Sequence, residues 1–325
     1  MPRVAVVVPT RNRGHLWSEL VECLAGQDWA GPFEVVAVDD ASQDDTPRIL
    51  EVLERRFPAL RTVRLPRQRG PATARNRGWR STDADVVAFT DDDCLPDPGW
   101  LRHLVSGLEH LDIVQGRTVI APGGSPPGAF STNVEIQQFS HYFQTCNIAY
   151  RREVLERLDG FDEAYGFSRG GAPNGEDVDL GWRAVEAGFS CGFEPDAVVG
   201  HPFSRSSFRL RLKSRLRSAR VVYLVRRHPG MREHFPHWLF FQESHPYALV
   251  PLLAAPVAAV LPSIALSVLV ILASFGPYVA YRMRRGRLAG RRRHLPVTIP
   301  AMWVVDAADI LVLAAASLRW TTPVL

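Results

Sequence analysis

The first 120 residues alternate between short apolar runs and longer stretches with helical periodicity. Residues 4–8 form a continuous apolar run, which is typical of a strand buried on both faces of a sheet. The same pattern predicts further strands at 34–40, 62–65 and 85–90. Helices are predicted between them at 14–26, 45–56 and 71–81. Strands and helices that alternate at this spacing predict an α/β fold, with a parallel sheet and helices on both of its faces.

Polar clusters follow three of the predicted strands. They read "PTRNR" at 9–13, "DDASQDD" at 39–45 and "DDD" at 91–93. The carboxyl ends of parallel strands lie along one edge of a sheet, and ligands of such sheets bind outside that edge. The three clusters therefore predict a single site.

Asp91, Asp92 and Asp93 are consecutive carboxylates that repel one another unless a positive charge faces them. Hard oxygen ligands favour Mg²⁺ or Mn²⁺, and magnesium is usually held by one or two carboxylates together with substrate phosphates. The alternative is a solvated acidic turn in which Asp97 caps a helix before Pro98. Because two other polar clusters lie at the same predicted edge, we favour a divalent ion that faces a diphosphate.

Taken in order, the motifs resemble those of the family 2 inverting glycosyltransferases, which have the Rossmann-like GT-A fold. The resemblance covers about residues 3–205. It implies a nucleotide-diphospho-sugar donor, such as a UDP- or GDP-sugar, a Mn²⁺ or Mg²⁺ cofactor, and transfer with inversion at the anomeric carbon. The segments that carry it are "VVVPTRNR" (6–13), "VDDASQDDT" (38–46), "GPATARNRGW" (70–79), "FTDDDC" (89–94), "TCNIAYRREVLERLDGFDE" (145–163) and "GEDVDLGWRAVEAGF" (175–189).

The resemblance assigns the nucleotide to the turn after the first strand, at Pro9, Thr10 and Arg11. An acid after the second strand is expected to contact the base, and Asp40 is favoured over Asp39 for this role.

The resemblance assigns the diphosphate and the metal to later motifs. Arg75 of "ARN" is placed to offset phosphate charge. In the D-x-D motif, Asp91 is expected to face the ribose and Asp93 to hold the metal, with Asp92 between them. Some relatives add a late histidine to the metal. Here that residue would be His201 of "VVGHPF", which could equally be structural.

A second pair of carboxylates, Glu176 and Asp177, lies where "NGEDVDLGWR" (174–183) enters a predicted helix. Acids in a first helical turn are stabilised by the helix dipole, so capping is one explanation. Inverting transfer, however, needs a base that takes a proton from the acceptor hydroxyl. The resemblance gives this role to Asp177, with Glu176 orienting the acceptor or the loop. Residues 167–173 are expected to form either a mobile loop over the acceptor or an ordinary turn.

Charge divides the chain into two parts. The net charge of the 325 residues is +4, but residues 1–200 carry 30 acids and 20 bases, whereas 201–325 carry 4 acids and 18 bases. Ten bases alternate with apolar residues between positions 205 and 232. Such a segment suits nucleic acid or an anionic membrane. Because no stacking or recognition motif accompanies the bases, we expect no nucleic-acid partner.

The stretch that follows these bases favours a membrane over nucleic acid as the partner. No residue from 244 to 281 is charged, and a second arginine cluster follows at 282–293. An apolar run of this length is a transmembrane candidate rather than a soluble core helix. Basic flanks favour the cytosolic side, so a hairpin or re-entrant pair turning near Pro262 is predicted. Residues 297–318 are apolar but carry Asp306 and Asp309 on one helical face, which favours a helix at the interface or packed on the protein.

These inferences predict three segments: a GT-A catalytic domain at 1–205, a basic amphipathic interfacial segment at 206–246, and hydrophobic membrane-associated helices at 247–325. We expect a hexosyltransferase on the inner or plasma membrane with a cytosolic catalytic domain. Its acceptor would be a hydroxyl of a lipid-linked or envelope glycan. The alternatives are a polyprenyl-phosphate sugar synthase and a catalytically inactive sugar-nucleotide-binding scaffold. The four cysteines show no pairing motif and are expected to be reduced thiols of a cytosolic protein.

Overall fold

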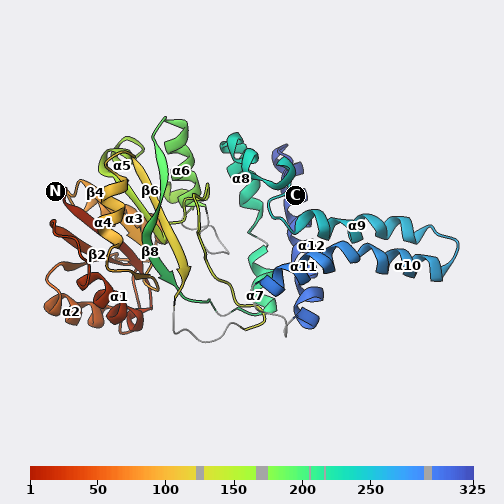
Figure 1. Cartoon of the computed structure of the whole chain (residues 1–325), viewed down its shortest axis with the longest axis horizontal. Coiled ribbons are helices and arrows are strands. Elements are labelled where there is room, and N and C mark those ends of the chain that lie inside the picture. Colours follow the sequence, from red (N-terminus) through yellow and green to blue (C-terminus); the bar gives the residue numbers. More distant parts are fainter. Residues whose placement is uncertain (122–127, 166–174, 205, 216, 289–294) are drawn as a thin grey trace. The chain divides into compact units, whose positions relative to one another are not determined.

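A computed structural model describes residues 1–121, 128–165, 175–204, 206–215, 217–288 and 295–325. The chain divides into two compact units (Figure 1). The first consists of Met1–Ser125 and Asn133–Phe203, and the second of Pro126–Thr132 and Ser204–Leu325. Each unit is described by itself, and the division into three segments stays a prediction.

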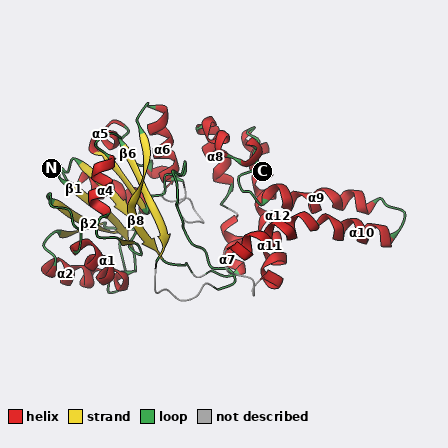
Figure 2. Cartoon of the chain, in the orientation of Figure 1, coloured by secondary structure: helices red, strands yellow, loops and turns green. Residues whose placement is uncertain are grey.

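The first unit contains a β-sheet with helices packed around it (Figure 2). The sheet has eight strands in the order β3-β2-β1-β4-β7-β6-β8-β5. The four strands expected from the sequence are present as β1 to β4 and pair in parallel. The other half is mixed, because β7 runs antiparallel to both β4 and β6, while β6 is parallel to β8. The prediction of a parallel sheet therefore holds for the first half only. The strands are β1 (Val4–Thr10), β2 (Phe33–Asp39), β3 (Leu60–Arg64), β4 (Val86–Thr90), β5 (Leu95–Pro96), β6 (Ile113–Ile120), β7 (Asn147–Arg151) and β8 (Cys191–His201).

Helices cover both faces of this sheet, as the buried residues of β1 show. Val4, Val6 and Val8 pack into one cluster with Trp17 of α1 and other residues of that face. On the opposite face, a Cβ at Gly78 of α3 would lie only 2.3 Å from Cγ1 of Val7, so this helix approaches the sheet too closely for a side chain. The helices are α1 (Trp17–Ala25), α2 (Thr46–Arg56), α3 (Pro71–Arg80), α4 (Trp100–Gly107), α5 (Arg152–Arg157) and α6 (Glu176–Glu186), with short 3₁₀ turns at Gly14–Leu16 and Glu163–Tyr165.

The second unit is helical. Its α9 and α10 form a hairpin that turns at residues 260–263, where the sequence predicted a turn (Figure 1). Two stretches are long and apolar enough to cross a membrane by length and composition, Ile264–Arg285 and Leu295–Trp320. The helices are α7 (Phe208–Arg215), α8 (Ala219–Arg227), α9 (His245–Ala259), α10 (Ile264–Ser274), α11 (Gly276–Leu288) and α12 (Leu295–Trp320), with 3₁₀ turns at Pro229–His234 and Pro236–Trp238.

The two acids of α12 are fully buried and each has a basic partner. Asp306 lies 2.6 Å from a guanidinium nitrogen of Arg282 and accepts a hydrogen bond from the hydroxyl of Tyr278 at 2.9 Å. Asp309 lies 3.1 Å from Arg215 of α7 and 3.3 Å from Nε2 of His245 of α9. These contacts explain why an apolar helix carries two acids: α12 packs on its own unit, as the sequence favoured.

Candidate active site

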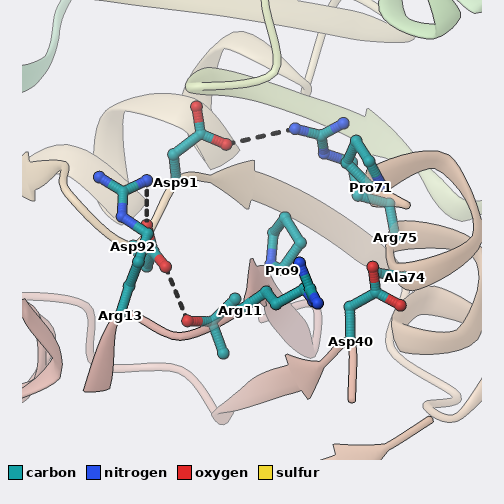
Figure 3. Close-up of a pocket in the computed structure, with 10 residues that line it drawn as sticks. Pro9, Arg11, Arg13, Asp40, Pro71, Ala74, Arg75, Asp91 and Asp92 are labelled. Carbon is teal, nitrogen blue, oxygen red and sulfur yellow. Dashed lines mark hydrogen bonds and ion pairs between the residues drawn. The ribbon is translucent and has the colours of Figure 1, made fainter. Parts of the chain in front are cut away.

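A pocket of about 300 Å³ opens at the carboxyl ends of the parallel strands (Figure 3). β1 ends at Thr10, β2 at Asp39 and β4 at Thr90, so the polar residues that follow these strands meet there. The three clusters that the sequence placed at one edge do contribute to one pocket. Its lining residues are Pro9, Thr10, Arg11, Arg13, Asp40, Pro71, Ala74, Arg75, Asp91 and Asp92.

Two arginines face the three consecutive carboxylates. Arg75 lies 3.2 Å from Asp91. Arg13 lies 2.9 Å from Asp92, a contact that Figure 3 shows. The same arginine lies 2.5 Å from Asp93. The sequence did not single out Arg13, although it belongs to "PTRNR". The available signal was an arginine three residues beyond the end of β1, in a chain that also carries three consecutive acids.

Asp92 points into the protein. Its Oδ2 accepts a hydrogen bond from the hydroxyl of Thr10 at 2.7 Å, and only 3% of the residue is exposed. Burial raises the pKa of this carboxyl to about 7, and the charge of Arg13 opposes that rise. Asp92 therefore connects the ends of β1 and β4, and a direct role in donor binding stays a prediction.

The residues predicted to hold a metal lie together. Ligand atoms of Asp91, Asp93, Cys94 and His201 all fall within 4.8 Å of one another. His201 has Nδ1 at 2.9 Å from the carbonyl oxygen of Pro202, which can only accept, so Nδ1 donates there and Nε2 is the nitrogen on the side of the carboxylates. That Nε2 is 3.8 Å from Oδ1 of Asp93. This distance between the two atoms is too long for a hydrogen bond. It is shorter than twice a magnesium–ligand distance of about 2.1 Å, so both atoms are near enough to bind one ion.

Cys94 is the poor ligand of this group. Like the other three cysteines it is a free thiol. It is fully buried, and burial raises the pKa of its thiol well above the usual range. Sulfur also suits softer metals. The donor set of Asp91, Asp93 and His201 thus fits a hard divalent cation such as Mg²⁺ or Mn²⁺.

The structure distinguishes the two acids after β2. Asp39 is fully buried; it accepts a hydrogen bond from the backbone of Ser42 at 2.9 Å and does not line the pocket. Asp40 lines the pocket, and its two oxygens accept hydrogen bonds from the backbone N–H groups of Arg69 (2.6 Å) and Gly70 (2.8 Å). Asp40 thus holds the turn that begins α3 and is the one of the two acids that lines the pocket, and its contact with a nucleotide stays a prediction.

Arg75 connects the D-x-D end of the site to the second carboxylate pair. Its Nη1 lies 3.0 Å from Oε1 of Glu176, while its Nη2 is the nitrogen that contacts Asp91. Only 5% of Arg75 is exposed. Burial opposes the charge of this guanidinium, but Asp91, Glu176 and Asp177 more than compensate, so its pKa is raised. The arginine therefore stays charged between the two acidic groups.

Glu176 and Asp177 begin α6, as the sequence predicted. Gly175 precedes them with a φ of 104°, a conformation that favours glycine, and directs the chain into the helix. Oε2 of Glu176 is buried and has no hydrogen-bond partner among the residues that the structure describes. Residues 167–173, upstream, lie outside the described residues.

The carboxyl of Asp177 has a pKa near neutral pH. Burial, helped by the neighbouring charge of Glu176, raises this pKa to about 7, and the charge of Arg75 opposes part of the rise. Within the same helix, Asp179 lies 2.8 Å from Nε of Arg183, one turn further along. The same arginine donates to the carbonyl oxygens of Leu158 and Gly160. These contacts tie α6 to the segment before it and hold the start of the helix, where Glu176 and Asp177 lie.

Residues 5–159, which include most of this site, match the model of the family described as Glycosyl transferase family 2. The chain carries a family 2 glycosyltransferase domain. Over 213 residues it is 31% identical to the pre-mycofactocin glycosyltransferase of Mycobacterium tuberculosis, a match that covers 61% of this chain and 42% of that protein. Over 216 residues it is 27% identical to glycosyltransferase AglE of Haloferax volcanii, covering 62% and 67% of the two chains. The match therefore spans less than half the length of the mycobacterial relative.

Solved structures of glycosyltransferases share the fold of this chain. One is the mannosyltransferase PcManGT from Pyrobaculum calidifontis in complex with GDP-Man and Mn²⁺, with a TM-score of 0.58 and 23% identity over 98% of this chain and 88% of that one. Another is S. aureus TarS 1-349 in complex with UDP, with a TM-score of 0.50 and 18% identity over 98% and 92%. At these identities the likeness concerns the fold. It confirms the predicted α/β fold of GT-A type, in which the sheet is mixed rather than wholly parallel.

Proposed function

We propose that the protein is a metal-dependent inverting glycosyltransferase that uses a nucleotide-diphospho-sugar, either a UDP- or a GDP-sugar. One observation carries the proposal: Arg75 joins the D-x-D carboxylate Asp91 to Glu176, beside Asp177, within a family 2 domain. This contact supports a donor site and a base that lie next to each other. The ligands named for PcManGT and TarS, GDP-Man with Mn²⁺ and UDP, agree with a nucleotide-sugar donor.

In this proposal the donor binds in the pocket of Figure 3. Pro9, Thr10 and Arg11 line it beside Asp40, where the nucleotide would bind. Asp91, Asp93 and His201 would hold Mn²⁺ or Mg²⁺, which neutralises charge on the departing diphosphate. Arg75 is close enough to add its own positive charge there.

In this proposal Asp177 is the base that acts on the acceptor. Its carboxylate takes the proton of the acceptor hydroxyl as that oxygen bonds to the anomeric carbon. The bond from this carbon to the diphosphate oxygen breaks on the opposite face, and the nucleoside diphosphate leaves. A single displacement of this kind inverts the carbon, and it needs no second carboxylate as nucleophile.

The acceptor is proposed to be a hydroxyl of a lipid-linked or envelope glycan at the inner or plasma membrane, with the catalytic domain on the cytosolic side. Two apolar helical stretches and the flanking arginines support membrane attachment. An acceptor that is itself anchored in a bilayer would explain why a glycosyltransferase carries such helices.

The test is transfer from radiolabelled UDP- and GDP-sugars to lipid extracts by the full-length protein in membranes, with Mn²⁺ or Mg²⁺ and with EDTA. We expect a metal-dependent, glycosidically linked lipid product of inverted configuration. A product labile to mild acid, as a sugar phosphate is, would identify a polyprenyl-phosphate sugar synthase instead. Donor binding without either transfer or hydrolysis would identify an inactive scaffold.

A further inference from the structure

The hairpin of α9 and α10 exposes an apolar surface that the described remainder of its unit leaves open. Figure 1 shows the hairpin extending beyond the other helices of the second unit. Val260 and Ile264, at its turn, are 81% and 85% exposed. No residue from 244 to 281 is charged. Its large exposed apolar side chains are Leu253, Val257, Val260, Ile264, Leu266, Val268, Leu269 and Leu272. A contiguous surface of this kind requires an apolar environment.

The base of the hairpin packs against α12. Ala248 of α9, Tyr278 of α11 and Ile310 of α12 form a buried cluster. The ring of Phe275, where α10 meets α11, lies 4.8 Å from that of Trp303 of α12. Phe275 therefore marks the level at which the contact with α12 ends and the exposed part of the hairpin begins.

Aromatic and charged residues surround this base. The rings of Tyr247 and Tyr281 stack with their centroids 4.9 Å apart. Arg285 pairs with Glu243 at 2.7 Å. Tyrosines and arginines of this kind are enriched where a membrane protein crosses from lipid to water. The base of the hairpin thus has the composition of a membrane interface, whereas the part beyond it is entirely uncharged.

The exposed part is too short to cross a bilayer. From Phe275 to Ile264 the return leg rises about 17 Å at 1.5 Å per residue. The hydrocarbon core is ~30 Å thick, so this leg reaches about its middle. The two legs lie against each other, since the hydroxyl of Ser267 on α10 donates to the carbonyl oxygen of Ala258 on α9 at 2.7 Å.

The acids of α12 argue that this helix does not cross either. Asp306 and Asp309 lie near its middle, fully buried and paired with Arg282 and Arg215. In a spanning α12 these four charged groups would lie near the bilayer centre, where each is costly. If α12 instead stays at the base of the hairpin, these four charged groups lie at the level of the tyrosine pair and the Arg285–Glu243 contact.

We propose that the α9–α10 hairpin is a monotopic anchor, which enters one leaflet as far as the middle of the bilayer and returns, while α12 stays at that membrane surface. The proposal rests on the membrane attachment in the proposed function and adds its topology. Both ends of the hairpin and both ends of α12 then lie on the same side of the membrane.

Cysteine labelling of the full-length protein in phosphatidylethanolamine–phosphatidylglycerol vesicles tests this topology. The background carries Cys23→Ser and Cys191→Ser, since only these two native cysteines are partly exposed. The variants are Ser263→Cys at the turn, Glu243→Cys before α9 and Thr321→Cys after α12. A membrane-impermeant maleimide should label positions 243 and 321 from the same side. Position 263 should react from neither side, even when reagent is loaded into the vesicles, and should react once detergent is added.

Three labelling results would overturn the proposal. Reaction of position 263 from the side opposite to 243 means that the hairpin spans. Reaction of position 263 from the same side means that the hairpin is not in the bilayer. Reaction of position 321 from the side opposite to 243 means that α12 spans.

A second measurement separates lipid from a protein occupant. Leu269→Asp should reduce sedimentation with vesicles at least about tenfold, because a carboxylate near the bilayer centre is strongly disfavoured. The matched control, Val52→Asp on α2 of the catalytic unit, should leave sedimentation unchanged. Unchanged vesicle binding by Leu269→Asp, with a dimer turned into a monomer, would assign the surface to a second copy of this chain and refute the proposal. Donor hydrolysis by each variant, measured in detergent, keeps failure of the anchor distinct from failure of the transferase activity.

Discussion

Replacing Arg75 by methionine removes the charge that joins the two halves of the site while keeping most of the side-chain volume. Its partner Glu176 has a side chain only 7% exposed, whereas that of Asp91 is 32% exposed. Removing one partner of a buried ion pair costs about 3–5 kcal/mol of folding stability. Because only one of the two carboxylates is well buried, we expect the lower end, about 3 kcal/mol. At ~2–4 °C per kcal/mol for a unit of this size, Tm should fall by roughly 6–12 °C.

Thermal unfolding followed by tryptophan fluorescence measures this loss, and Arg80→Met is its matched control. Arg80 lies on the same helix, and its partner Asp159 is 93% exposed, so this surface pair should contribute at most about 1 kcal/mol. Adding Glu176→Gln to Arg75→Met should restore part of the loss, since the uncompensated buried charge is then gone. If Arg75→Met cost no more than Arg80→Met, Arg75 would not be the buried connection described here.

Three further results are expected. Asp93→Ala should abolish the effect of Mn²⁺ on donor affinity in a thermal-shift titration while leaving the metal-free Tm within a few degrees; donor affinity that still responds to Mn²⁺ would remove Asp93 from the metal site. Because burial raises the pKa of Asp177 to about 7 and only its deprotonated form accepts a proton, kcat/KM should fall about tenfold per pH unit below that value; a flat profile from pH 5 to 8 contradicts this. Washing membranes with 1 M salt should leave the full-length protein bound, since salt screens the arginines but not the apolar hairpin; release by salt alone would show that its attachment is electrostatic.

Much of the first unit was predictable because its strands are uninterrupted apolar runs. β1, β2 and β4 lie within about two residues of the predicted positions, and α2 and α3 begin and end within one residue of them. The later strands gave no such signal. In β8, the segment from Cys191 to Asp196 is only partly buried and reads as polar, although it pairs with β6.

The chemistry of the site was predictable by residue type but not by contact. The sequence indicated that Asp91, Asp92 and Asp93 need a positive charge, and a metal was the natural choice. It did not indicate that two arginines far apart in the chain divide these acids between them, with Arg13 contacting Asp92 and Asp93 and Arg75 contacting Asp91. The preference for Asp40 over Asp39 came from the resemblance alone, because which of two adjacent side chains points into a pocket depends on where the strand ends; in the structure Asp40 lines the pocket and Asp39 does not.

The most direct test of the central claim is Asp177→Asn, which keeps the shape of the side chain and removes the base. Donor affinity, measured by titration calorimetry with Mn²⁺, should stay within a factor of about two, while transfer to the acceptor hydroxyl should fall by roughly 10²–10⁴-fold. The residual activity should also lose its dependence on pH near 7. Near-normal turnover by this variant, with donor binding intact, would contradict the assignment of Asp177 as the base and favour an acceptor that is already anionic.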